Sequence, residues 1–284
     1  MVRTQLKHAR LIVVKIGTST LTTAAGRVDH KNLSRLAGEI AALYKEGRRI
    51  ILVSSGAIAM GAERLNRVGK LKSIPEKQAA AAVGQSLLMK EYEAKFSKFH
   101  IPVAQLLLTR DTMDKRERYI NARTALQTLL EMGALPIINE NDTVAVEEIK
   151  VGDNDNLAAL VATLIGADLL VLLTDTDGFY LDYGKGKAPV SEIHDITAEI
   201  RTAAKGSGGF QGTGGMITKI EAAEICRAAG IPTVIASGRQ AGTLEKILNG
   251  AEIGTLLCPG VPGAKHRSAN AIIPHGETEV LESK

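Results

Sequence analysis

Tryptophan is absent from this 284-residue chain, aromatic residues make up only 3% of it, and there are two cysteines. Proteins that bind single-stranded nucleic acid stack bases on exposed aromatic rings, so a chain with so few rings is poorly suited to that function. The two cysteines, Cys226 and Cys258, do not have zinc-ligand spacing, and they favour a reducing compartment. Hydrophobic residues still make up 45%, which predicts a core of aliphatic side chains, as in buried parallel sheets.

The net charge is also small, because 35 basic and 31 acidic residues leave an excess of only +4. That balance fits a cytosolic enzyme with anionic ligands. The apolar run near the N-terminus meets Lys15 after a few residues, which is too short for the core of a signal peptide. No stretch reaches the roughly 20 apolar residues of a membrane span. We therefore expect a cytoplasmic protein that does not contact the membrane.

Short β-rich runs alternate with helical patterns along almost the whole chain. We expect strands at residues 11–17, 49–56, 101–109, 134–142, 167–178 and 231–237, and a possible hairpin at 185–195. We expect helices between Asp29 and Gly47 and at 76–99, 116–132, 157–165, 216–229 and 242–250. This alternation predicts an α/β fold, a three-layer αβα sandwich around a mainly parallel sheet. If the chain has two lobes, the boundary is expected near Gly166.

Polar segments follow several of the predicted strands, and ligands of open parallel sheets bind at the carboxyl ends of the strands. Lys15 follows four apolar residues and precedes Gly17 and Thr18. A lysine there either contacts an anion such as phosphate, helped by the backbone of the glycine turn, or reaches out of the strand end into solvent. Residues 54–56 are Ser-Ser-Gly before a predicted helix, which suits either a bound carboxylate or phosphate or an ordinary serine cap.

Two further segments favour a phosphate site. Residues 152–156 (GDNDN) hold more polar side chains than helix capping requires, and clustered carboxylates at a phosphate site hold lysines or a divalent cation. Residues 212–219 (GTGGMITK) place glycines and Lys219 at a helix start, where backbone N–H groups bind phosphate. Neither the P-loop nor the Rossmann pattern is present. No histidine lies in a motif, so a zinc site or a Ser-His-Asp triad has no support.

Taken together, these segments resemble the amino-acid kinase family, and in particular its glutamate-phosphorylating members. The resemblance runs in unbroken order over about residues 11–260. Its strongest segments are residues 13–22, 52–65, 78–89, 106–126, 136–162, 172–180 and 212–231. The resemblance implies one kinase domain at 1–260, with glutamate in a lobe at about 1–165 and ATP in a lobe at about 166–260. Residues 261–284 are expected to form a tail, without the PUA domain that many members carry.

The resemblance also implies roles for individual residues. Lys15 and Lys219 would neutralise the transferred phosphoryl group, and Asp155 would organise these two lysines. The implied glutamate contacts are Ser55, Gly56, Asn139, Asp142 and Asn154. The implied ATP contacts are Lys15, Thr174, Asp175, Thr213, Gly214, Gly215, Met216, Ile217, Thr218 and Lys219. Mg²⁺ would travel on the ATP phosphates without protein ligands of its own.

The implied reaction converts glutamate and ATP into γ-glutamyl phosphate, the first intermediate towards proline. A side-chain carboxylate has a pKa near ~4.3 and is ionised at neutral pH, so no general base is needed. Catalysis then depends on positioning and on neutralising charge. The family also leads us to expect feedback inhibition by proline and a homo-oligomer, either a dimer or a tetramer.

Two alternatives remain at this point. The first is a related kinase acting on acetylglutamate, aspartate, carbamate or a nucleoside monophosphate. Asp142 suits the ammonium of free glutamate, whereas a nucleotide acceptor would need arginines aimed at its phosphate. The second is a nucleic-acid-binding or regulatory protein, which a pI of about 9.0 supports but scattered basic residues and scarce aromatics oppose.

Overall fold

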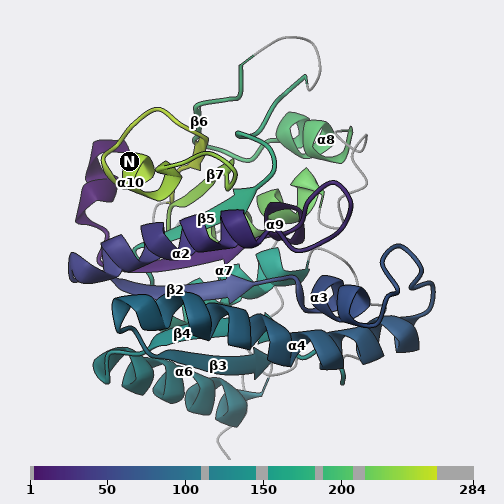
Figure 1. Ribbon diagram of the computed structural model, residues 1–284. Coiled ribbons are helices and arrows are strands. Elements are labelled where there is room, and N and C mark those ends of the chain that lie inside the picture. The colour runs from purple at the N-terminus through teal and green to yellow at the C-terminus, as the bar shows by residue number, and fades with distance from the viewer. Residues whose placement is uncertain (1–2, 110–114, 145–152, 183–187, 207–214, 261–284) are drawn as a thin grey trace, which may run out of the picture.

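The computed structural model describes residues 3–109, 115–144, 153–182, 188–206 and 215–260, which form one eight-stranded sheet with helices on both faces (Figure 1). The strand order is β3-β4-β2-β1-β5-β7-β8-β6, and only the β7–β8 pair is antiparallel. The strands are β1 (Leu11–Ile16), β2 (Arg49–Ser54), β3 (Val103–Leu108), β4 (Leu135–Glu140), β5 (Leu169–Thr174), β6 (Glu192–Ile193), β7 (Thr233–Ser237) and β8 (Thr255–Leu257). The predicted αβα sandwich around a mainly parallel sheet is confirmed.

Helices connect the strands and cover the sheet. They are η1 (Arg3–His8), α1 (Thr18–Leu21), α2 (His30–Lys45), α3 (Ala57–Arg64), α4 (Ile74–Phe96), η2 (Ser97–Phe99), α6 (Arg116–Glu131), α7 (Asp153–Ile165), α8 (Ala198–Gly206), α9 (Met216–Ala228) and α10 (Thr243–Leu248). No described helix is long and apolar enough to cross a membrane.

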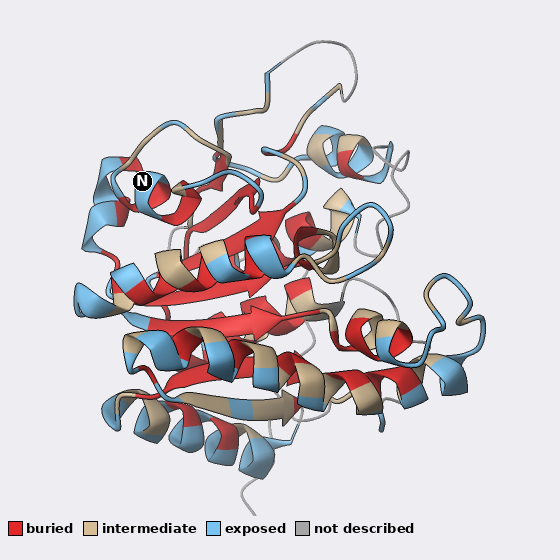
Figure 2. Ribbon diagram, in the orientation of Figure 1, coloured by how far each residue is buried: buried red, intermediate tan, exposed pale blue. Residues whose placement is uncertain are grey.

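Side-chain alternation along the central strands divides the core into two layers. Ile12, Val14 and Ile16 of β1 pack with apolar residues of α2, α4 and α10, whereas Leu11 and Val13 pack with residues of α6, α7 and α9. Every residue of β1 is buried, and β5 is buried along its full length as well (Figure 2). Because successive side chains of a strand point to opposite faces, Lys15 lies on the same face as Leu11 and Val13, under α7 and α9.

The bounds of two helices and the possible hairpin differ from the prediction. Helix α7 begins at Asp153, four residues before the predicted start. Helix α4 begins at Ile74 and ends at Phe96, because Ser73 and Glu76 form a capping box at its start. The described part of the possible hairpin contains β6, which pairs in parallel with β8.

Helices α3 and α4 touch through two glycines, and this contact fixes α3 beside the carboxyl end of β2. A Cβ atom on Gly61 would lie 1.8 Å from the Ala80 carbonyl oxygen, and one on Gly84 would lie 1.7 Å from the Ala57 carbonyl oxygen. Backbone atoms cannot move aside as a flexible side chain can. The position of α3, and of Gly56 at its N-terminus, therefore depends on the absence of side chains at both positions.

This contact predicts opposite outcomes for two glycine-to-alanine changes in helices. Gly84→Ala should lower the free energy of unfolding by about 1–3 kcal/mol, because the helices must separate. Gly38→Ala in α2 is the matched control, since no atom lies within 4 Å of its added Cβ. It should raise stability by about 0.5–1 kcal/mol through helix propensity. Urea unfolding measures both, and equal effects would contradict the account.

Candidate active site

The carboxyl ends of β1, β2, β4 and β5 lie along one edge of the sheet, because these four strands run parallel. Backbone hydrogen bonds continue the register past the strand ends, from Gly17 N to the Leu173 carbonyl (3.2 Å) and from Ser55 N to the Ile16 carbonyl (3.1 Å). Helices α7 and α9 begin beside this edge and bring Asp155 and Lys219 to it. The predicted convergence of polar segments at the strand ends is therefore confirmed for these residues.

Asp155 lies between two lysines that are far from it in the sequence. Its Oδ1 is 2.7 Å from Lys15 Nζ, and its Oδ2 is 3.1 Å from Lys219 Nζ. The hydroxyl of Thr218 also lies within hydrogen-bonding distance of Oδ2, at 2.8 Å. Asp155 is fully buried and each lysine is about 5% exposed. Lys15 therefore does not extend into solvent, and of the two alternatives for this lysine the contact with an anionic group is the one that the structure supports.

Burial and charge act in opposite directions on these groups. Burial raises the pKa of Asp155, but the two lysines and the hydrogen bonds from Lys15 and Thr218 outweigh it and bring the pKa down to about 2. Burial lowers the pKa of Lys15, the carboxylate of Asp155 opposes that change, and the ammonium of Lys219 adds to it. Asp155 is thus held ionised at any physiological pH.

The three side chains together carry two positive charges and one negative charge, and the carboxylate of Asp175 also acts on Lys15. Burying charged groups in this way is costly, and an anion at the same place would offset part of the cost. Gly17 leaves space next to the ammonium group of Lys15, because a Cβ on Gly17 would lie 3.4 Å from Lys15 Nζ. The arrangement suits the oxygens of a phosphoryl group.

A chain of side-chain amides lies next to the lysines. Asn154 Nδ2 donates to Ser55 Oγ (2.9 Å) and to Asn139 Oδ1 (3.0 Å), and Asn139 Nδ2 donates to Gln85 Oε1 (2.8 Å). The backbone N–H of Glu140 also donates to Asn139 Oδ1 (2.9 Å). Because a backbone N–H can only donate, it fixes which end of the Asn139 amide accepts, and thereby orients Asn154 and Gln85.

With the amides in this orientation, one acceptor oxygen and one donor nitrogen of the cluster have no hydrogen-bond partner in the described part of the chain. Asn154 Oδ1 and Gln85 Nε2 are buried and have no hydrogen-bond partner among the residues that the structure describes. An unpaired buried polar atom costs about 1–3 kcal/mol, so a ligand that pairs with it gains that much. An α-amino acid carries both an ammonium donor and carboxylate acceptors, and it therefore matches this pair.

The other predicted site residues lie at the ends of β4 and β5 and at the start of α9, and two of them fall outside the described residues. Thr174 is buried at the end of β5, and its hydroxyl donates to Asp175 Oδ1 (3.0 Å). Asp142 is half-buried and lies in the turn just after β4. Gly215 is the N-cap of α9 and makes no side-chain cap, and Met216 and Ile217 are half-buried in the first turn. Thr213 and Gly214 lie outside the described residues.

Sequence reasoning missed Gln85. It lies inside the alanine-rich helix predicted at residues 76–99, where no local pattern marks one glutamine as functional. Only the tertiary contact with Asn139 does so. The contact of Thr218 with Asp155 was missed as well, although Thr218 was predicted to be an ATP contact.

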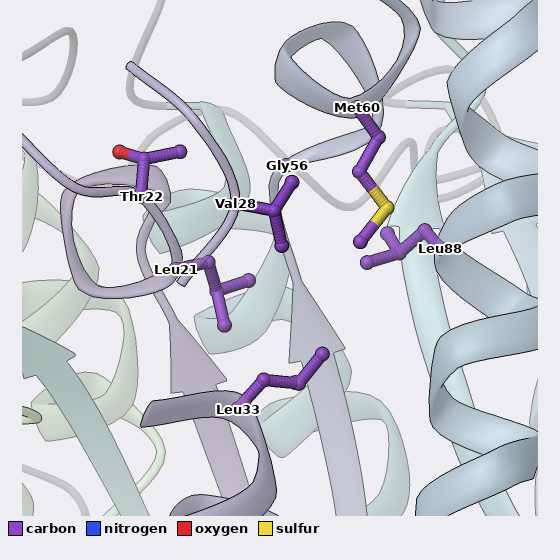
Figure 3. Close-up of a pocket in the computed structure, with 7 residues that line it drawn as sticks. All are labelled: Leu21, Thr22, Val28, Leu33, Gly56, Met60 and Leu88. Atoms are coloured by element: carbon purple, nitrogen blue, oxygen red, sulfur yellow. The ribbon is translucent and has the colours of Figure 1, made fainter. Parts of the chain in front are cut away.

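A small pocket beside Gly56 does not share this chemistry. It is lined by Leu21, Thr22, Val28, Leu33, Gly56, Met60 and Leu88 (Figure 3). Its side chains are apolar apart from the Thr22 hydroxyl, so it cannot hold a carboxylate or a phosphate. It lies on the side of Gly56 that faces the apolar layer of α2 and α4.

Comparison with known proteins places this geometry among small-molecule kinases. The model of the amino acid kinase family matches residues 10–237. The chain is 48% identical over 281 residues to glutamate 5-kinase from Geobacter metallireducens, covering 97% of this chain and 75% of that protein. It is 49% identical over 265 residues to glutamate 5-kinase from Moorella thermoacetica, covering 90% and 69%. Carbamate kinase from Giardia lamblia bound to AMP-PNP has the same fold, with a TM-score of 0.63, 21% identity and coverage of 89% and 99%.

The buried charges predict how stability responds to Asp155→Asn. The change leaves two buried ammonium groups without their carboxylate, and should lower the free energy of unfolding by about 3–5 kcal/mol at neutral pH. Burial already lowers the pKa of Lys15, and without the carboxylate nothing from Asp155 opposes that change. The unfolded chain then binds more protons at Lys15, so stability should recover as pH rises towards 10.

Asp195→Asn is the matched control, because Asp195 pairs with Arg227 at the surface, and its effect should stay within about 1 kcal/mol. In the unchanged protein, the lowered pKa of Asp155 stabilises the fold above about pH 4, and this contribution should be lost as pH falls towards 2. Urea unfolding across pH tests both. A loss in Asp155→Asn that does not change between pH 7 and 10 would contradict the assignment.

Proposed function

Because the chain belongs to the amino acid kinase family, we propose that it transfers the γ-phosphoryl group of ATP to the side-chain carboxylate of L-glutamate. The products are γ-glutamyl phosphate and ADP, and the reaction is the first step of proline biosynthesis. The observation that carries the proposal is the pair of buried lysines held by Asp155 next to the Ser55–Asn154–Asn139 cluster. The relatives named glutamate 5-kinase support the choice of acceptor.

The chemistry requires two anions to approach each other. The acceptor carboxylate is already ionised at neutral pH, so no side chain has to remove a proton. Lys15 and Lys219 would donate to the oxygens of the phosphoryl group and balance its charge, while Asp155 keeps both ammonium groups in place. Their burial strengthens this effect, because water does not screen the charges. The protein therefore acts by positioning and neutralisation.

Glutamate would bind through groups of both signs. The hydroxyl of Ser55 and the N–H of Gly56 suit an anionic oxygen, and Asn139 holds Asn154 in position. The unpaired Asn154 Oδ1 and the carboxylate of Asp142 would accept from the α-ammonium. Gln85 Nε2 would donate to a carboxylate oxygen. We assign this part of the site to a lobe at about residues 1–165.

ATP would bind on the other side of β1, in a lobe at about residues 166–260. Thr174 and Asp175 at the end of β5 would contact the nucleoside. The N-terminus of α9, which has no side-chain cap, would contact the phosphates through its free N–H groups, together with residues 213–219. Mg²⁺ would bind to these phosphates and neutralise part of their negative charge.

The described residues contain one group of possible metal ligands, Glu192, His194 and Cys258, at the edge formed by β6 and β8. That edge is separated from β1 by β5 and β7. A thiolate and an imidazole are also unlike the oxygen ligands that Mg²⁺ prefers. This group therefore has no part in the proposed reaction.

The proposal predicts a specific pattern of acceptor use. Purified protein with Mg²⁺-ATP should release ADP when glutamate is added, and hydroxylamine should trap the acyl phosphate as a hydroxamate. N-acetylglutamate, aspartate, carbamate and UMP should give little or no ADP. Activity with one of these instead of glutamate would preserve the kinase assignment and reject the acceptor.

Lys219→Met tests the second lysine in the same assay. It removes a donor to the phosphoryl group and should lower kcat about 10²–10³-fold. Lys246→Met is the matched control, because Lys246 is exposed in α10, and it should retain full activity. Equal activity of the two variants would contradict the role of Lys219.

We also propose that proline inhibits the enzyme in competition with glutamate. Proline shares the α-ammonium and α-carboxylate groups, so it could bind to Asp142 and Asn154 without offering a side-chain carboxylate. Raising proline should increase the apparent KM for glutamate and leave kcat unchanged. Unchanged activity at limiting glutamate and high proline would reject this proposal.

Two expectations complete the proposal. A biosynthetic kinase of this kind is expected in the cytoplasm. We also expect a dimer or a tetramer, which sedimentation equilibrium would distinguish from a monomer.

A further inference from the structure

A tyrosine lies directly behind the proposed glutamate site. Tyr92 of α4 is 1% exposed, and its hydroxyl oxygen lies 2.6 Å from Ser54 Oγ at the end of β2. Ser54 is itself fully buried, and its Oγ lies 3.0 Å from the carbonyl oxygen of Ser55. Two buried hydroxyl groups therefore connect α4 to the peptide that follows β2.

The direction of these hydrogen bonds follows from the acceptor at their end. A carbonyl oxygen can only accept, so the single proton of Ser54 Oγ is donated to Ser55. Ser54 Oγ then has no proton left for Tyr92, and the Tyr92 hydroxyl must donate to it. The result is a one-way series of donors from Tyr92 through Ser54 to the Ser55 carbonyl.

Holding this carbonyl also aims the next N–H group. In a planar trans peptide, the C=O and N–H groups point in opposite directions. The Gly56 N–H therefore points away from Ser54 and Tyr92. It has no acceptor among the described residues. Gly56 adopts a φ of 108°, a left-handed conformation that glycine reaches without the steric cost that a side chain would bring.

We propose that Tyr92 is a positioning residue for the acceptor substrate. Its hydroxyl, acting through Ser54, fixes the Ser55–Gly56 peptide so that the Gly56 N–H faces the substrate carboxylate. Tyr92 does not touch the substrate. The inference rests on the proposed function, because it assigns a carboxylate to the Ser55–Gly56 site.

Tyr92→Phe removes the first donor and keeps the ring that fills the core. Tyr44→Phe is the matched control, because the Tyr44 hydroxyl also donates to a backbone carbonyl, that of Gly133 at 2.5 Å, on a different strand connection. Both variants lose one hydrogen bond and should lose similar thermal stability. Only Tyr92→Phe should raise the KM for glutamate, by about 3–10-fold, as expected for one misplaced hydrogen bond. Its KM for ATP should not change, and its kcat should change less than its KM for glutamate.

Ser54→Ala gives an independent check through a double-mutant cycle. Either single change breaks the same series of donors, so the double variant should raise the KM for glutamate no further than the larger single effect. Independent effects would multiply instead. The double variant should also be more stable than Ser54→Ala alone, which leaves the Tyr92 hydroxyl buried without an acceptor.

Two results would overturn the inference. If the unchanged protein uses glutamate but Tyr92→Phe and Tyr44→Phe have the same KM for it, Tyr92 is a structural residue only, and the proposed function stands. If the unchanged protein does not use glutamate, the proposed function fails and the inference fails with it.

Discussion

The buried carboxylate of Asp155 between Lys15 and Lys219 is the interaction on which the rest of the site depends. Both ammonium groups lie in a nearly dry environment, where an unpaired charge is strongly unfavourable. Within this group of three side chains, two charges are positive and one is negative. In the proposed function this local balance favours an anion, and a bound phosphoryl group would stabilise the buried lysines.

The fold positions these three residues through elements that the chain brings together from distant places. Strand β1 supplies Lys15, the first turn of α7 supplies Asp155, and the first turn of α9 supplies Lys219. The amide chain and the Ser55–Gly56 peptide are fixed from the other side by α4, which contacts β4 through Gln85, β2 through Tyr92 and α3 through Gly84. Helix α4 therefore contacts the Ser55–Asn154–Asn139 cluster from one side, while β1, α7 and α9 bring the three charged groups together.

Much of this arrangement could be predicted from the sequence, because it follows from local patterns. The strand that carries Lys15 near its end and the glycines before Lys219 are continuous segments, and parallel strands bring such ends to one edge. The individual roles came from the resemblance to a family. The contacts of Gln85 with Asn139 and of Tyr92 with Ser54 could not be predicted from local patterns. The first joins residues that are 54 positions apart in the sequence, and the second joins residues that are 38 positions apart. The start of α7 was missed because Asn and Asp favour caps over helices unless charges and packing compensate.

The central claim is that the buried ammonium group of Lys15 serves catalysis and not folding, and Lys15→Met tests it most directly. The variant keeps the Lys219–Asp155 pair and removes the buried ammonium whose pKa burial lowers. Urea unfolding and glutamate-dependent ADP release should be measured on the same preparation. The account predicts a free energy of unfolding equal to or above that of the unchanged protein, with kcat lower by about 10²–10³-fold. A variant that loses stability but keeps its activity would contradict it.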